Sequence, residues 1–273
     1  MIITEKLDGA LLAARYAFMP NKLRYCGGDS NAELFAYTAN QQSDDGLKAM
    51  LKEFEAMYPY LRLIAEANKI ADPFNYKVVE AYWLGNELLN NVSMNNFYRY
   101  LVDEQKLKKK LRPALTEKIF GKIPAGAKPH HSFHVLNIPK RTGNYPVEHT
   151  IKTMDECRVS WGKVKALRPR RIRLGRKISN LKTAVQNSKA NFTEAISVEY
   201  QPLVVAGNDI LLGEPVEREV WAEMNEKAFV EELKPGDLVS VHWGWVCDKL
   251  SQQQVENLNK WTNWNLALAN LTT

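Results

Sequence analysis

The first half of the chain places hydrophobic residues at helical spacing, with helix-start residues between the runs. Asp29-Ser30 and Asp72-Pro73 are such starts, because Asp and Ser side chains accept hydrogen bonds from first-turn amides and proline suits the first turn. The broad apolar face of residues 74–90 indicates a helix near the centre of a bundle. The pattern predicts helices at residues 11–18, 31–38, 44–57, 59–70, 74–90, 95–110 and 113–120.

The pattern changes after Ile123-Pro-Ala-Gly-Ala-Lys-Pro129, where proline and glycine predict a break between domains. Beyond it, short strand-like runs alternate with turns, and such a series is typical of a small barrel. We therefore predict an α+β fold with three parts: a helical domain at 1–128, a His-rich connector at 129–156, and a small, OB-like β-barrel with a C-terminal helix at 157–273. The predicted strands are 131–138, 158–167, 172–174, 195–200, 203–205, 210–212, 217–221 and 238–247, and the predicted helices are 146–156 and 251–270.

The composition is that of a globular chain kept in a reducing compartment. Hydrophobic residues make up 45% and charged residues 25% of the 273 residues, which argues against wholesale disorder. No apolar run reaches the eighteen residues that a membrane span needs, and the acidic start does not resemble a signal peptide. Cys26, Cys157 and Cys247 are odd in number and widely spaced, so we expect free thiols and a cytoplasmic location.

Positive charge is concentrated in one segment. The net charge is +6, yet residues 157–193 contain eleven Lys or Arg residues and no Asp or Glu, so the rest of the chain carries −5. The cluster at 168–177 is expected to attract an acidic partner or an anion, or to form one solvated face. A nucleic-acid-binding barrel is an alternative function, but no aromatic residues for base stacking are interleaved with these arginines, which argues against it.

Two segments of the second half together resemble the HypC/HupF-type chaperones of [NiFe]-hydrogenase maturation. Cys157-Arg-Val-Ser-Trp-Gly-Lys-Val164 resembles the start of that family, where a cysteine is followed by three residues, proline, glycine or alanine, lysine and valine. Pro235-Gly-Asp-Leu-Val-Ser-Val-His-Trp-Gly-Trp-Val-Cys247 resembles its Gly-Asp-x-Val-x-Val-His-x-Gly stretch. A helix follows the second segment in both cases. The whole chain looks like an uncharacterised bacterial family in which a helical domain precedes a HypC-like one.

The resemblance implies an assembly factor rather than an enzyme. In HypC-like chaperones the motif cysteine and histidine are held to carry an iron with carbon monoxide and cyanide ligands, which implicates Cys157 and His242 here. The implied partners are a HypD-like maturation protein or a hydrogenase large subunit. The cysteine of that family is amino-terminal, whereas Cys157 is internal, so a nearby connector is expected to provide a further ligand.

The connector holds the densest group of histidines in the chain. On the predicted strand, His130 and His134 share a face and His131 lies opposite. A metal ion bound by His130 and His134, with His149 or Cys157 completing the site, is therefore predicted. The alternative function is a metal-dependent enzyme at the domain junction that uses His130, His134 and His149. The other interpretation is a polar cluster that orients its neighbours.

The sequence also predicts the surroundings of the other two cysteines, Cys26 and Cys247. The turn Tyr25-Cys-Gly-Gly-Asp-Ser30 precedes a predicted helix, and it is either an anion-holding loop or a plain turn with a buried cysteine. Cys247 alternates in phase with Trp243 and Trp245 in the predicted last strand, so we expect it in the core and outside any metal site.

Overall fold

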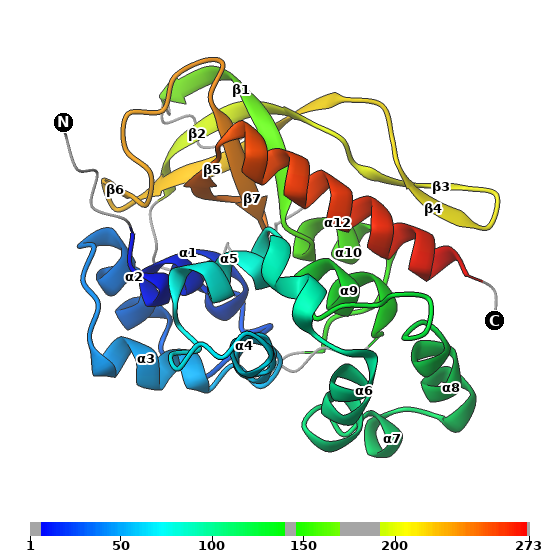
Figure 1. Cartoon of the computed structure of the whole chain (residues 1–273). Helices are drawn as coiled ribbons and strands as arrows, with labels where there is room; N and C mark the ends of the chain where they lie inside the picture. The colour runs from blue at the N-terminus through cyan, green and yellow to red at the C-terminus, as the bar shows by residue number, and fades with distance from the viewer. Residues whose placement is uncertain (1–6, 140–145, 170–191, 272–273) are drawn as a thin grey trace.

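The computed structural model describes residues 7–139, 146–169 and 192–271. Helices come first, strands follow, and a long helix ends the chain (Figure 1), which confirms the predicted α+β class. The helices are α1 Gly9–Lys22, α2 Asn31–Ala39, α3 Asp45–Lys52, α4 Met57–Ala67, α5 Tyr76–Trp83, the 3-10 helix η1 Glu87–Asn91, α6 Met94–Asp103, α7 Leu107–Lys110, α8 Pro113–Gly121, α9 His131–Asn137, α10 Ile151–Cys157 and α12 Gln252–Asn270. The strands are β1 Ser160–Pro169, β2 Phe192–Tyr200, β3 Leu203–Ala206, β4 Asp209–Leu212, β5 Val216–Met224, β6 Lys227–Ala228, β7 Leu238–His242 and β8 Trp245–Lys249.

Several predicted helices are shorter than their hydrophobic pattern. The helix predicted at 74–90 divides into α5 and η1 around Gly85, whose φ is +85°. A Cβ at this position would lie 2.0 Å from Cδ1 of Trp261 in α12. The break therefore has a tertiary cause: the backbone turns at a glycine so that the indole of the last helix can pack against it.

The strand predicted at 131–138 is wrong, because these residues form α9. All seven residues of α9 are buried, so the helix has no polar face and its sequence shows no helical period. Its start is set by His130, whose Nδ1 accepts a hydrogen bond of 3.1 Å from the Ser132 amide. In Figure 1 this short helix lies below α12, against which it packs.

The single strand predicted at 238–247 is also wrong, because it is a hairpin of β7 and β8. Its two-residue turn is Trp243-Gly244, with φ of 51° and 69°. Left-handed conformations at both turn residues match the twist of paired antiparallel strands. The prediction that Cys247 lies in the core is confirmed, since its exposure is 0%.

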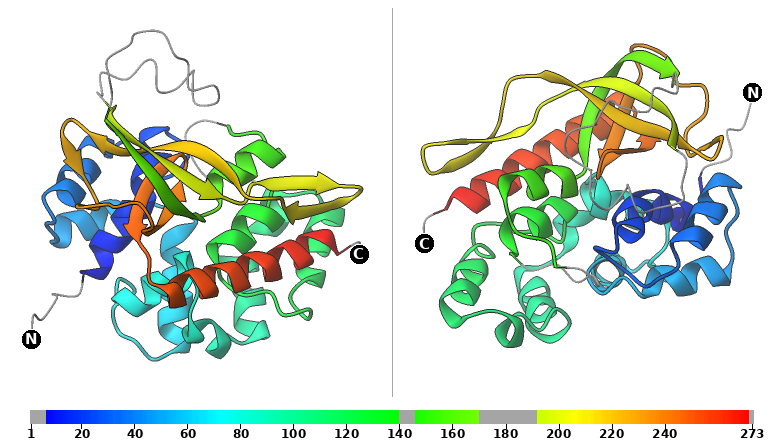
Figure 2. Two further views of the ribbon diagram at one scale, coloured as in Figure 1. Left: turned by 90° about the horizontal axis from the view of Figure 1, so that it is seen from above. Right: turned by 180° about the vertical axis from the view of Figure 1, so that it is seen from behind.

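The main sheet has the strand order β2-β1-β7-β8-β5-β6, and β5 also pairs with β2. Five strands thus close on themselves around a separate cluster of small aliphatic side chains. That cluster consists of Val164, Ile196, Val198, Val220, Ala222, Val239, Val241 and Val246. The β3–β4 hairpin leaves this sheet and runs toward the C-terminal end of α12 (Figures 1 and 2).

The helices and the sheet share one continuous core that crosses residue 128. Helix α1 lies against the β7–β8 hairpin, where the rings of Phe18 and Trp245 are 5.4 Å apart. The Tyr16 hydroxyl lies 2.9 Å from Ser240 Oγ in the same contact. The division into a helical domain, a connector and a barrel stays a prediction. The contact between α1 and β7 belongs to the shared hydrophobic core.

Two of the sequence predictions fall outside the described residues. These are the strand at 172–174 and residues 170–177 of the basic cluster. Within the described part of the chain, no helix combines the length and apolarity needed to cross a bilayer.

Candidate metal centre

Three buried side chains from distant parts of the chain meet beneath the β7–β8 hairpin. His131 from α9, Cys157 from α10 and His242 from β7 each present one ligand atom, and these atoms all lie within 4.8 Å of one another. Among the described residues, one group of three or more His, Cys, Asp or Glu side chains has its ligand atoms this close together, and it is this one. Around a tetrahedral ion with bonds of about 2.0 Å to nitrogen and 2.3 Å to sulfur, ligand atoms stand roughly 3.3–3.7 Å apart. Small side-chain movements would therefore bring the three atoms onto one ion.

Backbone carbonyls orient both imidazoles. His131 Nε2 lies 2.7 Å from the Cys157 carbonyl oxygen, and His242 Nδ1 lies 2.7 Å from the Tyr16 carbonyl oxygen. A carbonyl only accepts, so these ring nitrogens carry the protons, and in a neutral ring the other nitrogen keeps its lone pair. Metal-binding histidines in proteins are oriented by the same kind of outer hydrogen bond. The lone pair of His131 then lies on Nδ1, 3.2 Å from the Tyr82 hydroxyl.

Local structure brings the three segments together. Cys157 is the last residue of α10, and the amide of Trp243, in the turn that follows His242, donates to the carbonyl oxygen of Glu156 at 2.8 Å. This bond ties the end of β7 to the end of α10. Because His131 bonds the Cys157 carbonyl, α9 is fixed to the same point.

Burial and aromatic rings set the electrostatics of the centre. Burial lowers the pKa of His131 well below its usual value, and the nearby His242 lowers it further, so His131 is neutral near pH 7. Its ring centroid lies 4.4 Å from that of Trp83 and 5.1 Å from that of His242. A neutral imidazole is the form that binds a metal ion, so the surroundings favour ligation over protonation.

The three side chains line a cavity of about 30 Å³. The rest of its wall is largely apolar and comes from α1, the segment before α4, α4 itself and α5. Cys26, Tyr82 and His134 also contribute to it. One water molecule occupies about 30 Å³ in the liquid, and a cavity of 10–15 Å³ on this measure admits one. The cavity has room for an ion with a small ligand and none for an organic substrate.

The predicted connector ligands are placed differently from the sequence prediction. His130 caps α9 and lies 2.7 Å from the Ser132 hydroxyl, and His149 Nε2 lies 3.0 Å from the Val135 carbonyl oxygen. His134 lines the cavity, with Nδ1 3.5 Å from the Tyr60 hydroxyl. The structure brings Cys157 and His242 together, while His130, His134 and His149 lie outside the three-residue group. The second predicted set, which uses those three histidines alone, does not assemble.

His131 is the residue that sequence reasoning missed. Strand alternation placed it on the face opposite His130 and His134, whereas the helix turns it toward Cys157. The one available signal was its position inside the histidine cluster of the connector. No pattern in the sequence pointed to Tyr82.

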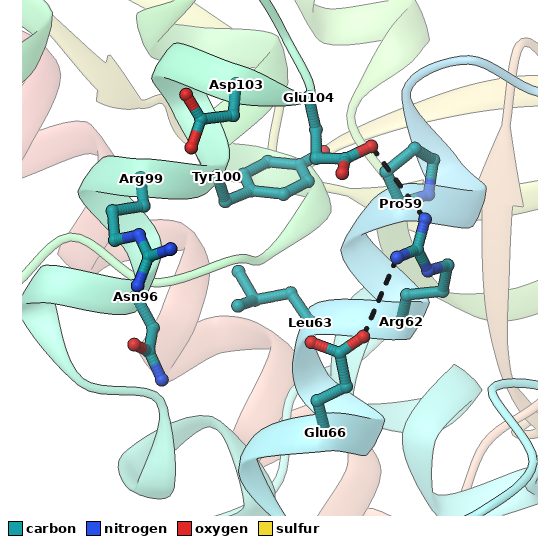
Figure 3. A pocket seen from close by; sticks show the side chains of 9 residues that line it. All are labelled: Pro59, Arg62, Leu63, Glu66, Asn96, Arg99, Tyr100, Asp103 and Glu104. Carbon is teal, nitrogen blue, oxygen red and sulfur yellow. Dashed lines mark ion pairs between the residues drawn. The ribbon is translucent and has the colours of Figure 1, made fainter.

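A larger pocket of about 250 Å³ lies on the surface between α4 and α6 (Figure 3). Arg62 crosses it, with ion-pair distances of 3.7 Å to Glu66 and 3.9 Å to Glu104, and Arg99 and Asp103 face the same hollow. Ion pairs of this exposure contribute little free energy. The pocket has no cysteine or histidine in its wall, so the ligand chemistry described above belongs to the smaller, buried cavity.

Comparison with known proteins gives one family. No curated protein and no solved structure matches the chain. The profile of DUF6390, described as a family of unknown function, matches residues 5–189 and 179–273. These two matches extend over nearly the whole length and include His131, Cys157 and His242, and the chain therefore belongs to the DUF6390 family.

Proposed function

We propose that this protein is a metal-carrying assembly factor that holds one transition-metal ion through His131, Cys157 and His242 and docks a partner protein. The observation that carries the proposal is the meeting of one thiol and two imidazoles within 4.8 Å. Cys157 is 26 residues from His131 and 85 from His242. A thiolate with two imidazoles suits borderline and soft first-row metals such as zinc, copper and iron.

The geometry of the imidazoles supports a ligand role over a purely structural one. Both rings donate an N–H to a backbone carbonyl, so the second nitrogen of each ring carries the lone pair that a metal needs. For His131 this nitrogen accepts from the Tyr82 hydroxyl, and a metal ion would replace that hydrogen bond. All three residues are at most 7% exposed. A bound cation would be neutralised in part by the Cys157 thiolate, because binding displaces the thiol proton.

The size of the cavity favours holding over catalysis. An active site for organic substrates usually has several hundred cubic ångströms, while this cavity has about 30 Å³. An ion with one or two diatomic ligands is of the right size. An assembly factor needs a cavity that holds its metal ion, together with a surface that a partner protein can recognise.

The resemblance to HypC/HupF-type chaperones makes the proposal more specific. The closed pairing of β1, β2, β5, β7 and β8 supports a small barrel of the OB-like kind. In this interpretation the ion is iron with carbon monoxide and cyanide ligands, and the partner is a HypD-like protein or a hydrogenase large subunit. Cys157 is internal, so no terminal amine stands beside it, and His131 provides a nitrogen donor in that place.

The test is metal analysis of protein purified without oxygen, alone and together with the partner candidates. We expect about one metal ion per chain, and infrared bands of carbon monoxide and cyanide when the maturation partners are present. Cys157→Ser and His242→Ala should lose the metal. Cys247→Ala is the matched control, because Cys247 is equally buried but lies outside the cavity lining.

Two results would contradict the proposal. One is wild-type protein without stoichiometric metal after anaerobic purification with its partners. The other is Cys157→Ser protein that keeps its metal content and captures the partner as well as the wild type does. If a metal binds but the infrared bands are missing, the carrier role stands and the iron–diatomic assignment fails.

A further inference from the structure

A second cysteine lines the same small cavity. Cys26, in the loop after α1, belongs to the cavity wall together with His131, Cys157 and His242. It lies outside the group of ligand atoms within 4.8 Å, and it is half-buried whereas the other three are buried. Two cysteines and three histidines therefore line one cavity; the third histidine, His134, has its Nδ1 3.5 Å from the Tyr60 hydroxyl and lies outside the group of ligand atoms.

The loop that carries Cys26 is held against the cavity by buried contacts. The side-chain amide of Asn21, which is 1% exposed, donates to the carbonyl oxygens of Cys26 at 2.9 Å and Gly28 at 2.6 Å. Gly27 has φ of +76°, and a Cβ there would lie 2.6 Å from the ring of Phe54. These contacts leave little freedom for the backbone on either side of the thiol.

Cys26 also lies where the cavity approaches solvent. Among the residues that line the cavity, Cys26 and Ala56 are the two that are not buried. Of these two residues, Cys26 is the one whose side chain can bind a metal ion. The three buried side chains provide three ligands, while zinc-like ions in closed protein sites take four.

We propose that Cys26 is the entry ligand and second thiolate of the metal centre, which gives a site of two cysteines and two histidines. This inference rests on the metal-carrying role in the proposed function and names the cargo class: a thiophilic, tetrahedral divalent ion of the zinc, cobalt or iron type, held by four protein ligands in place of the iron with diatomic ligands. The ion first meets the half-buried thiolate, and a side-chain movement then places it among Cys157, His131 and His242. The thiol proton of each cysteine goes to water as the sulfur–metal bond forms.

The first experiment titrates the reduced full-length protein with Co²⁺ and records its absorption. Thiolate-to-cobalt charge transfer grows with the number of bound sulfurs, so Cys26→Ser should keep one cobalt per chain and lose about half of this band. Cys247→Ala should leave the band unchanged. An unchanged band in Cys26→Ser, with one cobalt bound, overturns the inference and leaves the proposed function intact.

The second experiment uses the wild-type chain alone, so it does not depend on the folding of a variant. Alkylation followed by mass spectrometry measures the modification rate of each cysteine with and without Co²⁺. We expect Cys26 to react in the metal-free protein and to slow at least tenfold with cobalt, while the buried Cys157 and Cys247 react slowly throughout. If Cys26 is alkylated at the same rate with and without Co²⁺, it is not a ligand and the inference is refuted. If the wild type binds no cobalt at all, both the inference and the proposed function fail.

Discussion

The contact between α1 and the β7–β8 hairpin contains a buried ion pair whose removal has a calculable effect. Arg15 Nη1 lies 2.7 Å from Asp248 Oδ1, with side-chain exposures of 10% and 15%. At an effective dielectric constant of about 20, unit charges at this distance attract by roughly 6 kcal/mol, and desolvation offsets much of this. Arg15→Met keeps the volume of the side chain but leaves the carboxylate buried and unpaired, which costs about 3 kcal/mol of unfolding free energy.

The pH dependence of this loss identifies its cause. Burial raises the pKa of Asp248 in the folded protein, and Arg15 opposes this rise. Without Arg15 the pKa of the folded state rises further, while the unfolded chain keeps an ordinary value near 4. A raised pKa in the folded state stabilises the fold below pH 4 and loses this contribution as pH rises through the folded value. The unfolding free energy of Arg15→Met should therefore be lowest at pH 8. As the pH falls and Asp248 takes up a proton in the folded state, this free energy should rise by about 1.4 kcal/mol per pH unit.

Urea unfolding at pH 5 and pH 8 measures both quantities. Arg15→Met with Asp248→Asn should be less destabilised than Arg15→Met alone, because no charge is then left unpaired. Lys48→Met is the matched control, since the Lys48–Asp72 pair at 3.0 Å is more exposed and should change stability by less than about 0.5 kcal/mol. A loss below about 1 kcal/mol for Arg15→Met, or one that is equal at both pH values, would refute the argument.

Two other changes test the packing of the buried core. Gly85→Ala should lower the unfolding free energy by about 2–5 kcal/mol in urea titration, because the residue has φ of +85° and its Cβ would meet the Trp261 ring. A loss below about 1 kcal/mol would contradict the close approach of Trp261 to this backbone. Burial raises the pKa of Tyr16, Tyr60 and Tyr100 above 10, so stability should fall as pH rises above about 10 by roughly 1.4 kcal/mol per unit for each. Tyr60→Phe should make this slope shallower by one proton, and an unaltered slope would show that Tyr60 is not involved.

The helical half was largely readable from the sequence, because its helices are amphipathic and carry local start signals. Asp44, the first residue of the helix predicted at 44–57, caps α3 through its side chain. The two named start signals held less well, because Ser30 makes no side-chain bond to α2, and Asn75 rather than Asp72-Pro73 caps α5. Such caps depend on residues next to one another in the chain, so a pattern can reveal them. The helix predicted at 74–90 was too long, because the break at Gly85 depends on packing against Trp261 of α12, more than 170 positions away.

The candidate site was readable only in part. Cys157 and His242 came from motif resemblance, and neither spacing nor periodicity predicts that residues 85 positions apart should meet. His131 was assigned to the wrong side because α9 is buried on every face. A helix without a polar face has no period for the sequence to display.

The sequence alone was enough for the α+β class, for a helical half followed by strands and a final helix, and for the chemistry available in three cysteines and five histidines. Only the tertiary structure decided which of these side chains share a cavity. The packing of α1, α9 and α10 against β7 sets those distances, and the carbonyls of Tyr16 and Cys157 select which nitrogen of each imidazole carries the proton. Such contacts join residues that are remote in the chain, and a one-dimensional pattern of hydrophobic and polar positions contains no information about them.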